Sequence, residues 1–149
     1  CEDRQVSWLP SYGPEMRGGT ANCSVTVSDS PIGSPIISHP DILIAMNLPS
    51  LDKYEDSVKP GGQIYIDSTL IERKVNRTDV SAFYIPATQM ASDSGLTTLA
   101  NMIIMGKVLR EGGAVSYEGL GDALKKVVSA KHADLYDANM KAIEMGYNF

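Results

Sequence analysis

Apolar and polar positions along the chain predict strands in its first half and helices in its second half. Residues 22–28 alternate with a period of two, which predicts a half-buried strand whose apolar face carries Cys23, Val25 and Val27. A shorter apolar stretch at residues 6–9 stops at a proline and predicts another strand. Between these two segments lies a loop rich in glycine and proline.

A continuous apolar run at residues 41–46 shows no alternation and predicts a strand covered on both faces, as in parallel sheets. Ser50 is a candidate cap for a short helix, and residues 63–67 form the next strand. The segment 41–67 is therefore predicted to be a β-α-β unit, with a further strand at residues 82–85. Strands separated by helices predict an α/β fold with three layers, α/β/α, around a mostly parallel, Rossmann-like sheet.

The last third of the chain is predicted to be helical. An almost wholly apolar segment, residues 97–110, predicts a helix that is deeply buried or lies at an interface, with Gly112-Gly113 as its end. Ser116 is predicted to cap a second helix, and residues 132–144 form a third that stops at Gly146. The length of 149 residues fits a single domain.

Composition narrows the classes of function. The formal net charge is −5, so the sequence lacks the basic footprint that binding to a nucleic-acid backbone requires. No apolar run approaches the ~20 residues that cross a bilayer, and no leader is evident. We expect a cytoplasmic protein without a membrane segment.

The chain has two cysteines, Cys1 and Cys23, which are too few for a structural zinc site or an iron–sulfur cluster. We expect both to be free thiols in a reducing cytoplasm. The sequence runs from Cys1 directly into a strand-like stretch, and we expect the native protein to extend further upstream.

The loop at residues 11–22 has the most informative chemistry of the chain. Arg17 suits bidentate contact with a carboxylate or a phosphate, and Glu15 lies two residues before it. Glycines at positions 13, 18 and 19 allow close approach and expose backbone N–H groups. Because the loop links two strands, we expect it at a strand end, where ligands bind in open α/β sheets. The alternative is a rigid loop in which Glu15 and Arg17 pair with nearby backbone or with another subunit.

Other polar residues are weaker candidates. His39 and His132 lie far apart with no third ligand at zinc spacing, so no metal site is predicted. Asn101, on an otherwise apolar helix, could reach a ligand or a partner, although a satisfied core amide is the commoner arrangement. Residues 67–69 could orient a ligand hydroxyl but fit an ordinary turn better. The methionines of the second half mostly have helical spacing and are expected to fill the core.

The segment Tyr12-Gly13-Pro14-Glu15-Met16-Arg17-Gly18-Gly19-Thr20-Ala21-Asn22 resembles the signature loop of the gamma subunit of 2-oxoacid:ferredoxin oxidoreductases. Further matches to that family follow in order along nearly the whole chain: Val27-Ser28-Asp29, Ile32-Gly33-Ser34-Pro35, Pro40-Asp41, Met46-Asn47, Ser50-Leu51, Lys59-Pro60-Gly61-Gly62, Ile85-Pro86-Ala87-Thr88, Ala100-Asn101-Met102 and Asn139. The Glu-Met-Arg-Gly-Gly form is more similar to the 2-oxoglutarate-type enzymes than to the pyruvate type. Branched-chain substrates such as 2-oxoisovalerate remain an option.

The resemblance implies a non-redox subunit of a complex that decarboxylates a 2-oxoacid on thiamine diphosphate, passes electrons through iron–sulfur clusters to ferredoxin and forms an acyl-CoA. The alpha and beta subunits would hold the thiamine site, and a ferredoxin-like delta subunit would hold the clusters. The isolated chain would then bind none of these cofactors and would be inactive.

The gamma subunit would contribute packing and one wall of the coenzyme A site. No catalytic residue is predicted in this chain, and the resemblance leaves open whether isolated chains form a homodimer. The residues predicted to face coenzyme A or a partner subunit are Tyr12, Gly13, Glu15, Arg17, Gly18, Gly19 and Asn101.

One departure from the family concerns its amino terminus, which usually opens with a strand and a Gly-x-Gly-Gly-Gln-Gly turn suited to phosphate. No such turn occurs here, because Gly61-Gly62-Gln63 follows a proline and enters a strand. We therefore expect this chain to lack an upstream Gly-rich strand-turn segment. A class I methyltransferase-like domain is the main alternative, since Lys59-Pro60-Gly61-Gly62 before a strand is similar to a turn of those enzymes. That fold and a free-standing dinucleotide-binding domain both need an earlier Gly-rich loop, which is not visible.

Overall fold

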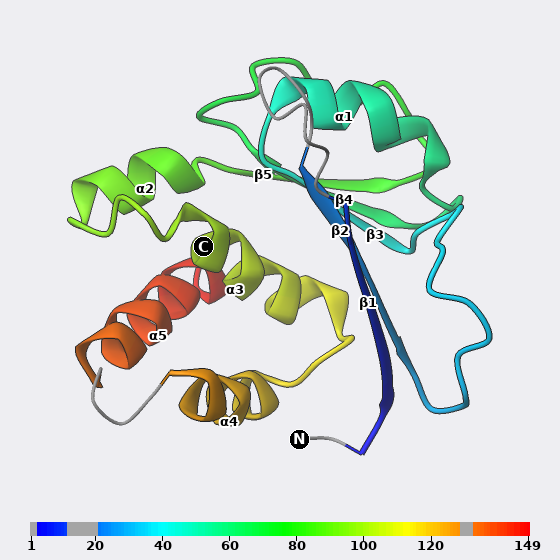
Figure 1. The fold of residues 1–149 in the computed structure, drawn as a ribbon. Helices are drawn as coiled ribbons and strands as arrows, with labels where there is room; N and C mark the ends of the chain where they lie inside the picture. The colour runs from blue at the N-terminus through cyan, green and yellow to red at the C-terminus, as the bar shows by residue number, and fades with distance from the viewer. Residues whose placement is uncertain (1–2, 12–20, 129–132) are drawn as a thin grey trace.

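The computed structural model describes residues 3–11, 21–128 and 133–149. Its strands form two separate sheets (Figure 1). The first is a hairpin in which β1 (Gln5–Ser11) and β2 (Asn22–Ser28) pair antiparallel. The two strand segments predicted near the amino terminus are therefore present, but they pair with each other and not with the parallel sheet.

The second sheet has three parallel strands in the order β3-β4-β5. These strands are β3 (Ile42–Ala45), β4 (Gln63–Asp67) and β5 (Ser81–Ile85). The predicted β-α-β unit and the predicted parallel pairing are both confirmed.

Helices cover both faces of the parallel sheet, which gives the three layers that the sequence predicted (Figure 1). One face carries α1 (Leu48–Tyr54) and the short 3-10 helix η1 (Glu55–Ser57). The other face carries α3, against which α5 packs. The helices of this second layer and its flanks are α2 (Ala87–Asp93), α3 (Ala100–Gly112), α4 (Tyr117–Val127) and α5 (Ala133–Tyr147).

The central strand β4 shows how the sequence builds these layers. Side chains on a strand alternate between the two faces of its sheet. Ile64 and Ile66 pack in the cluster under α1, whereas Tyr65 packs with Ile103 of α3, and all four side chains are fully buried. The Tyr65 ring also stacks on Phe83 of β5, with 4.9 Å between ring centroids.

The helix after β3 begins earlier than predicted. Asn47, not Ser50, is its N-cap, because the Asn47 side chain accepts a hydrogen bond from the backbone N–H of Ser50 at 2.9 Å. Both residue types cap helices well, so the sequence offered two candidates only three positions apart.

Two burial predictions are wrong. Ile44 of β3 is 41% exposed, so the described elements do not cover both faces of this apolar strand. In the hairpin, the cross-strand pair of Trp8 and Val25 lies on the predicted apolar face, yet the two are 61% and 52% exposed. Cys23, on the same face, is an exposed free thiol.

Two of the predicted helix ends are confirmed and one is wrong. Gly113 ends α3 in a left-handed conformation at φ 64°, and the Ser116 hydroxyl caps α4 by accepting from the N–H of Gly119. Gly146 does not stop the last helix but lies inside α5, where α5 crosses α3 closely. Within the described ranges no helix has the length and apolar character of a membrane span.

Candidate functional site

The predicted site loop, Tyr12 to Gly19, lies outside the described residues, but its two ends are described. Ser11 and Asn22 are paired opposite each other at the end of the hairpin. Asn22 Nδ2 donates a hydrogen bond to the hydroxyl of Tyr54 at 2.9 Å, which ties this end of the hairpin to the last residue of α1.

One expectation about the strands that flank this loop is wrong. We expected the loop at a strand end of an open parallel sheet, but the strands that flank it form an antiparallel ribbon of their own. The rule that ligands bind at the carboxyl ends of parallel strands therefore does not locate this loop.

Asn101 is the one predicted site residue that the structure describes. It lies in the first turn of α3 and is exposed, so the alternative of a satisfied core amide is wrong. A contact of Asn101 with a ligand or a partner stays a prediction. Asn139, which the resemblance also included, donates through Nδ2 to the carbonyl of Leu135 within its own helix.

Asp67 is a fully buried carboxylate at the carboxyl end of the central strand. It accepts hydrogen bonds from the Thr69 N–H at 3.1 Å, the Thr88 N–H at 3.2 Å and the Thr88 hydroxyl at 2.6 Å. The N–H of Ile71 donates to the carbonyl of Asp67, so the predicted turn is confirmed. Asp67 joins the end of β4 to the start of α2, and this set of partners gives it a structural role.

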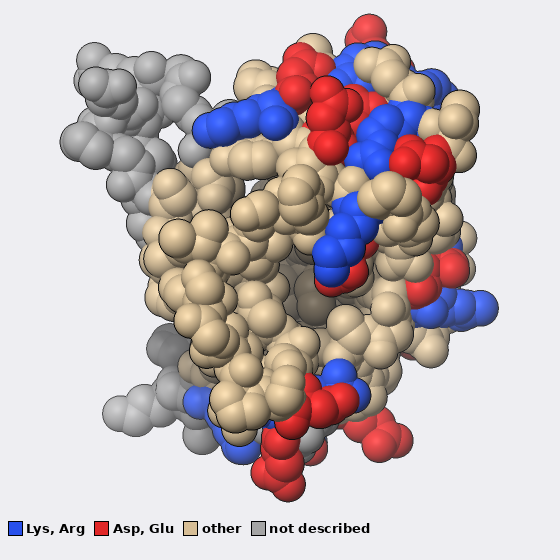
Figure 2. All heavy atoms as spheres, turned by 90° about the vertical axis from the view of Figure 1, so that its right-hand side faces the viewer, with Lys and Arg blue, Asp and Glu red and all other residues tan. Residues whose placement is uncertain are grey.

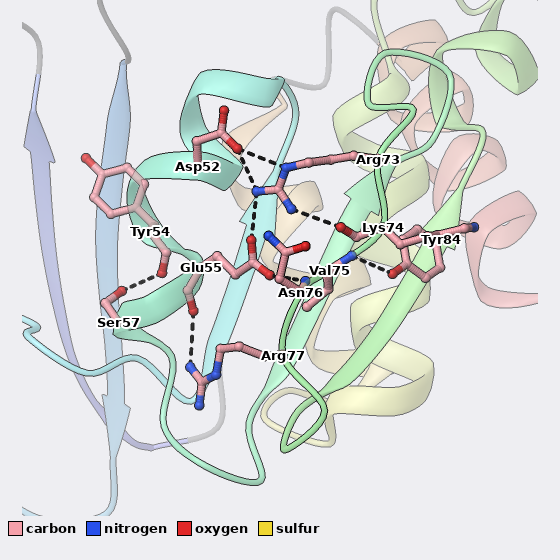
Figure 3. A network of polar contacts seen from close by, with 10 residues as sticks. All are labelled: Asp52, Tyr54, Glu55, Ser57, Arg73, Lys74, Val75, Asn76, Arg77 and Tyr84. Atoms are coloured by element: carbon pink, nitrogen blue, oxygen red, sulfur yellow. Dashed lines mark hydrogen bonds and ion pairs between the residues drawn. The ribbon is translucent and has the colours of Figure 1, made fainter.

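A second buried carboxylate, Glu55, organises the network shown in Figure 3. Its side chain is 5% exposed and lies 2.7 Å from Nη2 of Arg73. Its other oxygen accepts from the backbone N–H of Asn76 at 2.5 Å. Arg73 also contacts Asp52 at 2.6 Å, and the hydrogen bonds that the Arg73 guanidinium donates to Asp52 and Glu55 raise its pKa.

Arg77 extends the same network along η1 (Figure 3). It donates to the carbonyl of Glu55 at 3.1 Å and also to the carbonyl of Val58. Its ion pair with Asp79 raises the pKa of Arg77 and lowers that of Asp79, chiefly through the hydrogen bonds between them. The network fastens residues 68–80, which connect β4 to β5 without a helix, onto α1 and η1. No local sequence pattern indicated this network.

A hollow of about 440 Å³ opens at the amino ends of β3 and β4, and Figure 2 shows the surface hollowed near the centre of that view. Its two cations already have partners. Lys59 pairs with Asp41 at 2.9 Å, and Arg4 lies 3.4 Å from Asp29 and donates to the carbonyl of Ala114. In the described ranges, no group of three or more His, Cys, Asp or Glu side chains could hold a metal ion.

Comparisons with known proteins give this geometry a context. A family model described as "Pyruvate ferredoxin/flavodoxin oxidoreductase" matches residues 2–149. The ketoisovalerate oxidoreductase subunit VorA of Methanothermobacter thermautotrophicus is 37% identical over 146 residues, which cover 97% of this chain and 30% of that protein. The 2-oxoglutarate synthase subunit KorC of Methanocaldococcus jannaschii is 32% identical over 148 residues, which cover 98% of this chain and 78% of that protein. The chain thus spans less than a third of VorA but most of KorC.

Solved structures share the fold. The gamma subunit of a keto/oxoacid ferredoxin oxidoreductase from Geobacter sulfurreducens superposes with a TM-score of 0.77 at 30% identity, over 97% of this chain and 79% of that one. A 2-oxoglutarate:ferredoxin oxidoreductase from Magnetococcus marinus, solved with 2-oxoglutarate, coenzyme A and succinyl-CoA bound, gives a TM-score of 0.80. The match covers 97% of this chain and 25% of that one, and at 19% identity it shows the fold alone.

Proposed function

Because the chain belongs to the pyruvate ferredoxin/flavodoxin oxidoreductase family, we propose that it works as the gamma component of a complex that decarboxylates a 2-oxoacid to an acyl-CoA and passes electrons to ferredoxin. The observation that carries this proposal is the family match over residues 2–149, supported by gamma-type relatives that align with nearly all of the chain. The same match favours this reading over a methyltransferase-like domain.

The proposed substrate is 2-oxoglutarate. Support comes from the Glu-Met-Arg-Gly-Gly form of residues 15–19 and from the 2-oxoglutarate synthase relatives. A branched-chain 2-oxoacid is the second candidate, because the ketoisovalerate relative is 37% identical over 146 residues.

In the proposed division of labour, this chain binds and positions, and other subunits carry the reactive groups. Thiamine diphosphate supplies the electron sink for decarboxylation when it is bound, and we assign it to the alpha and beta subunits. We assign the iron–sulfur clusters to a ferredoxin-like delta subunit, since two cysteines cannot ligate one. The assembled complex would work in the cytoplasm.

The proposed contribution of this chain to coenzyme A binding rests on the loop from Tyr12 to Gly19. Arg17 would hold a phosphate or carboxylate of the ligand, and the neighbouring glycines would let the backbone approach it. The Asn22 to Tyr54 hydrogen bond supports this by fixing one end of the loop against α1. Asn101 would act as a further polar contact.

The test is a substitution of Arg17 by Ala in the assembled complex purified from the native host. We expect the KM for coenzyme A to rise by roughly tenfold or more, as loss of a charge-assisted contact predicts, with an unchanged KM for the 2-oxoacid. Lys125→Ala, at an exposed position on α4, is the matched control for loss of a positive charge. An unchanged coenzyme A requirement together with unchanged subunit association would overturn the site assignment.

The substrate is tested separately with the unmodified complex. Reduction of ferredoxin is measured with 2-oxoglutarate, 2-oxoisovalerate and pyruvate at equal concentration. The largest kcat/KM is expected for 2-oxoglutarate, and a larger value for either other acid would replace it as the substrate. Mass spectrometry of the co-purified chains identifies the partner subunits.

A further inference from the structure

The strand β5 has an open outer edge, because among the described strands it pairs with β4 alone. The Ser81 N–H donates to the carbonyl of Gly62, and the Ile85 carbonyl accepts from the N–H of Ser68, both at 2.9 Å. Backbone groups of successive residues on a strand point alternately to its two edges. The N–H and C=O groups of Ala82 and Tyr84 therefore point away from β4, and no group of the described residues bonds to them.

This strand is held firmly on both faces although its outer edge is open. On the face toward α3, the Phe83 ring stacks on Tyr65 with 4.9 Å between ring centroids. On the other face, Lys74 Nζ lies 3.9 Å from the centroid of the Tyr84 ring, and the Tyr84 hydroxyl accepts from the Val75 N–H at 2.9 Å (Figure 3). The edge is thus preorganised, and a pairing strand does not have to order β5 first.

The edge also lacks the features that keep sheet edges from pairing. Edge strands of natural proteins commonly carry charged side chains, a proline or a bulge. The sequence has no charged residue between Asp79 and Asp93, β5 contains no proline, and its register with β4 runs one residue to one throughout. An edge without such features is a template for pairing with another strand.

We propose that a second copy of this chain covers this edge, with the two β5 strands antiparallel about a two-fold axis at Phe83. Ala82 of each copy then lies opposite Tyr84 of the other copy. Each of these two pairs exchanges two N–H···O bonds, and the parallel sheets of the two copies join into one.

The charges beside the edge favour a second copy over a different chain. A two-fold axis places a surface against itself, so that surface has to be complementary to itself. Because β5 is uncharged, no like charges meet along the strand. Residues 68–80, which cover one face of β5, carry Glu72 and Lys74, and both are exposed and form no ion pair within the described residues. This acid and this base, two positions apart, can each pair with the opposite charge of the other copy.

The test is the oligomeric state of the full-length gene product purified without other subunits, measured by sedimentation equilibrium. We expect a dimer at micromolar concentrations, and a monomer throughout that range would overturn the proposal. Ala82→Pro removes the outward N–H and leaves the bonds to β4 in place, so the dissociation constant of the dimer should rise by roughly tenfold or more. Ala82→Ser keeps the N–H and is the matched control, which should dissociate like the unmodified protein. Equal constants for the two variants would overturn pairing through β5.

Amide hydrogen exchange of the unmodified protein tests the same pairing without the proline variant. We expect the amides of Ala82 and Tyr84 to exchange at least tenfold more slowly when the protein is mostly dimeric than when it is mostly monomeric. The amide of Phe83 points to β4 and should not change. Protection that does not depend on concentration would assign the pairing strand to the same chain, and protection that needs the other subunits would assign it to one of them. Either result would overturn the proposal.

A charge exchange tests the two-fold arrangement. Lys74→Glu would place acids against each other across the axis, so the dissociation constant should rise by roughly threefold or more. Adding Glu72→Lys to this variant restores opposite charges, and the constant should fall back toward that of the unmodified protein. A double variant that dissociates as readily as Lys74→Glu alone would overturn this arrangement of the two copies.

Discussion

At the residue scale, Glu55 illustrates how a buried charge can organise a segment that lacks regular structure. Its carboxylate accepts from the Arg73 guanidinium and the Asn76 N–H, so its charge is compensated although the side chain is 5% exposed. A buried carboxylate without such partners would be strongly destabilising. Glu55 of η1 therefore holds the connection between β4 and β5 at two points, Arg73 and Asn76.

Replacing Glu55 by Gln is expected to lower the free energy of unfolding by about 2–3 kcal/mol, because a neutral amide cannot compensate the charge of Arg73 and its NH2 group would face one of the two donors, the guanidinium or the Asn76 N–H. Urea unfolding measures the change as a lower midpoint at constant m-value. Asp52→Asn is the matched control, since Asp52 contacts the same Arg73 from a side chain that is 56% exposed. Its expected cost is below about 1 kcal/mol. Equal losses in the two variants would contradict the role given to Glu55.

The raised pKa of Tyr65 predicts that the stability of the folded protein depends on pH in the alkaline range. Burial, with a smaller contribution from the Glu111 carboxylate, raises the pKa of Tyr65 from 10.0 to about 12. Between pH 10 and 12 the unfolded chain loses this proton while the folded chain keeps it, so stability falls as the pH rises through this window.

Thermal unfolding of Tyr65→Phe tests this explanation. At neutral pH the variant is expected to lose about 1 kcal/mol, because the Tyr65 hydroxyl donates to Gln63 at 2.9 Å. Between pH 10 and 12, however, its Tm should fall less steeply than that of the unmodified protein. Parallel slopes for the two proteins would show that Tyr65 does not cause the decline.

Single residues also show what the sequence could predict. The caps formed by Ser116 and Gly113 follow from local chemistry, and both predictions are confirmed. The contact of Glu55 with Arg73 joins residues 18 positions apart, and no local pattern indicates it. The same holds for the hydrogen bond between Asn22 and Tyr54, which joins residues 32 positions apart.

At the scale of elements, the pattern of apolar residues predicted the strands and helices that contribute most to the core. The parallel strands and the long helix α3 have continuous apolar patterns, and both are confirmed. The helix α2 was not predicted, because it is short, follows Pro86 and has no side-chain cap. Gly146 was predicted to stop the last helix, because glycine is common just after helix ends. In the structure it allows α5 to pack closely against α3.

The crossing of α3 and α5 gives a sharp test of that packing role. A Cβ atom added at Gly106 would lie 2.0 Å from the carbonyl oxygen of Ile143, so Gly106→Ala must push the helices apart. We expect a loss of about 3 kcal/mol or more in the free energy of unfolding.

Gly121→Ala on α4 is the matched control for this crossing. An added Cβ there meets its nearest atoms at 3.9 Å, so alanine should stabilise the helix by about 0.5–1 kcal/mol. Chemical denaturation measures the free energy of unfolding of both variants. A loss for Gly121→Ala as large as that for Gly106→Ala would rule out close packing as the cause.

At the scale of the whole molecule, the sequence did not predict correctly which apolar side chains are buried, because burial depends on the elements that surround a strand. The alternating pattern of β2 correctly indicated a strand with one apolar face. The pattern does not say what covers that face, and Trp8 and Val25 on it are 61% and 52% exposed. The exposure of Ile44 on β3 has the same explanation, because a continuous apolar run indicates burial only where other elements cover both faces of the strand.

Among the described residues, two hydrogen bonds link opposite ends of the hairpin to the rest of the molecule, from Arg4 to the carbonyl of Ala114 and from Asn22 to the hydroxyl of Tyr54. Removing one link leaves the other in place, so Arg4→Ala and Tyr54→Phe should each speed amide exchange in β1 and β2 by about fivefold, as loss of ~1 kcal/mol predicts. The double variant should speed it by roughly 30-fold, because the losses at two separate sites add.

Hydrogen exchange of the two single variants and the double variant measures this, with the amides of β4 as an internal reference that should not change. Tyr84→Phe is the matched control, because its hydroxyl accepts from the N–H of Val75 and its loss should affect residues 68–80 but not the hairpin. If the double variant exchanges no faster than either single one, the hairpin is held by other contacts. In that case its position relative to the parallel sheet would not depend on these two links.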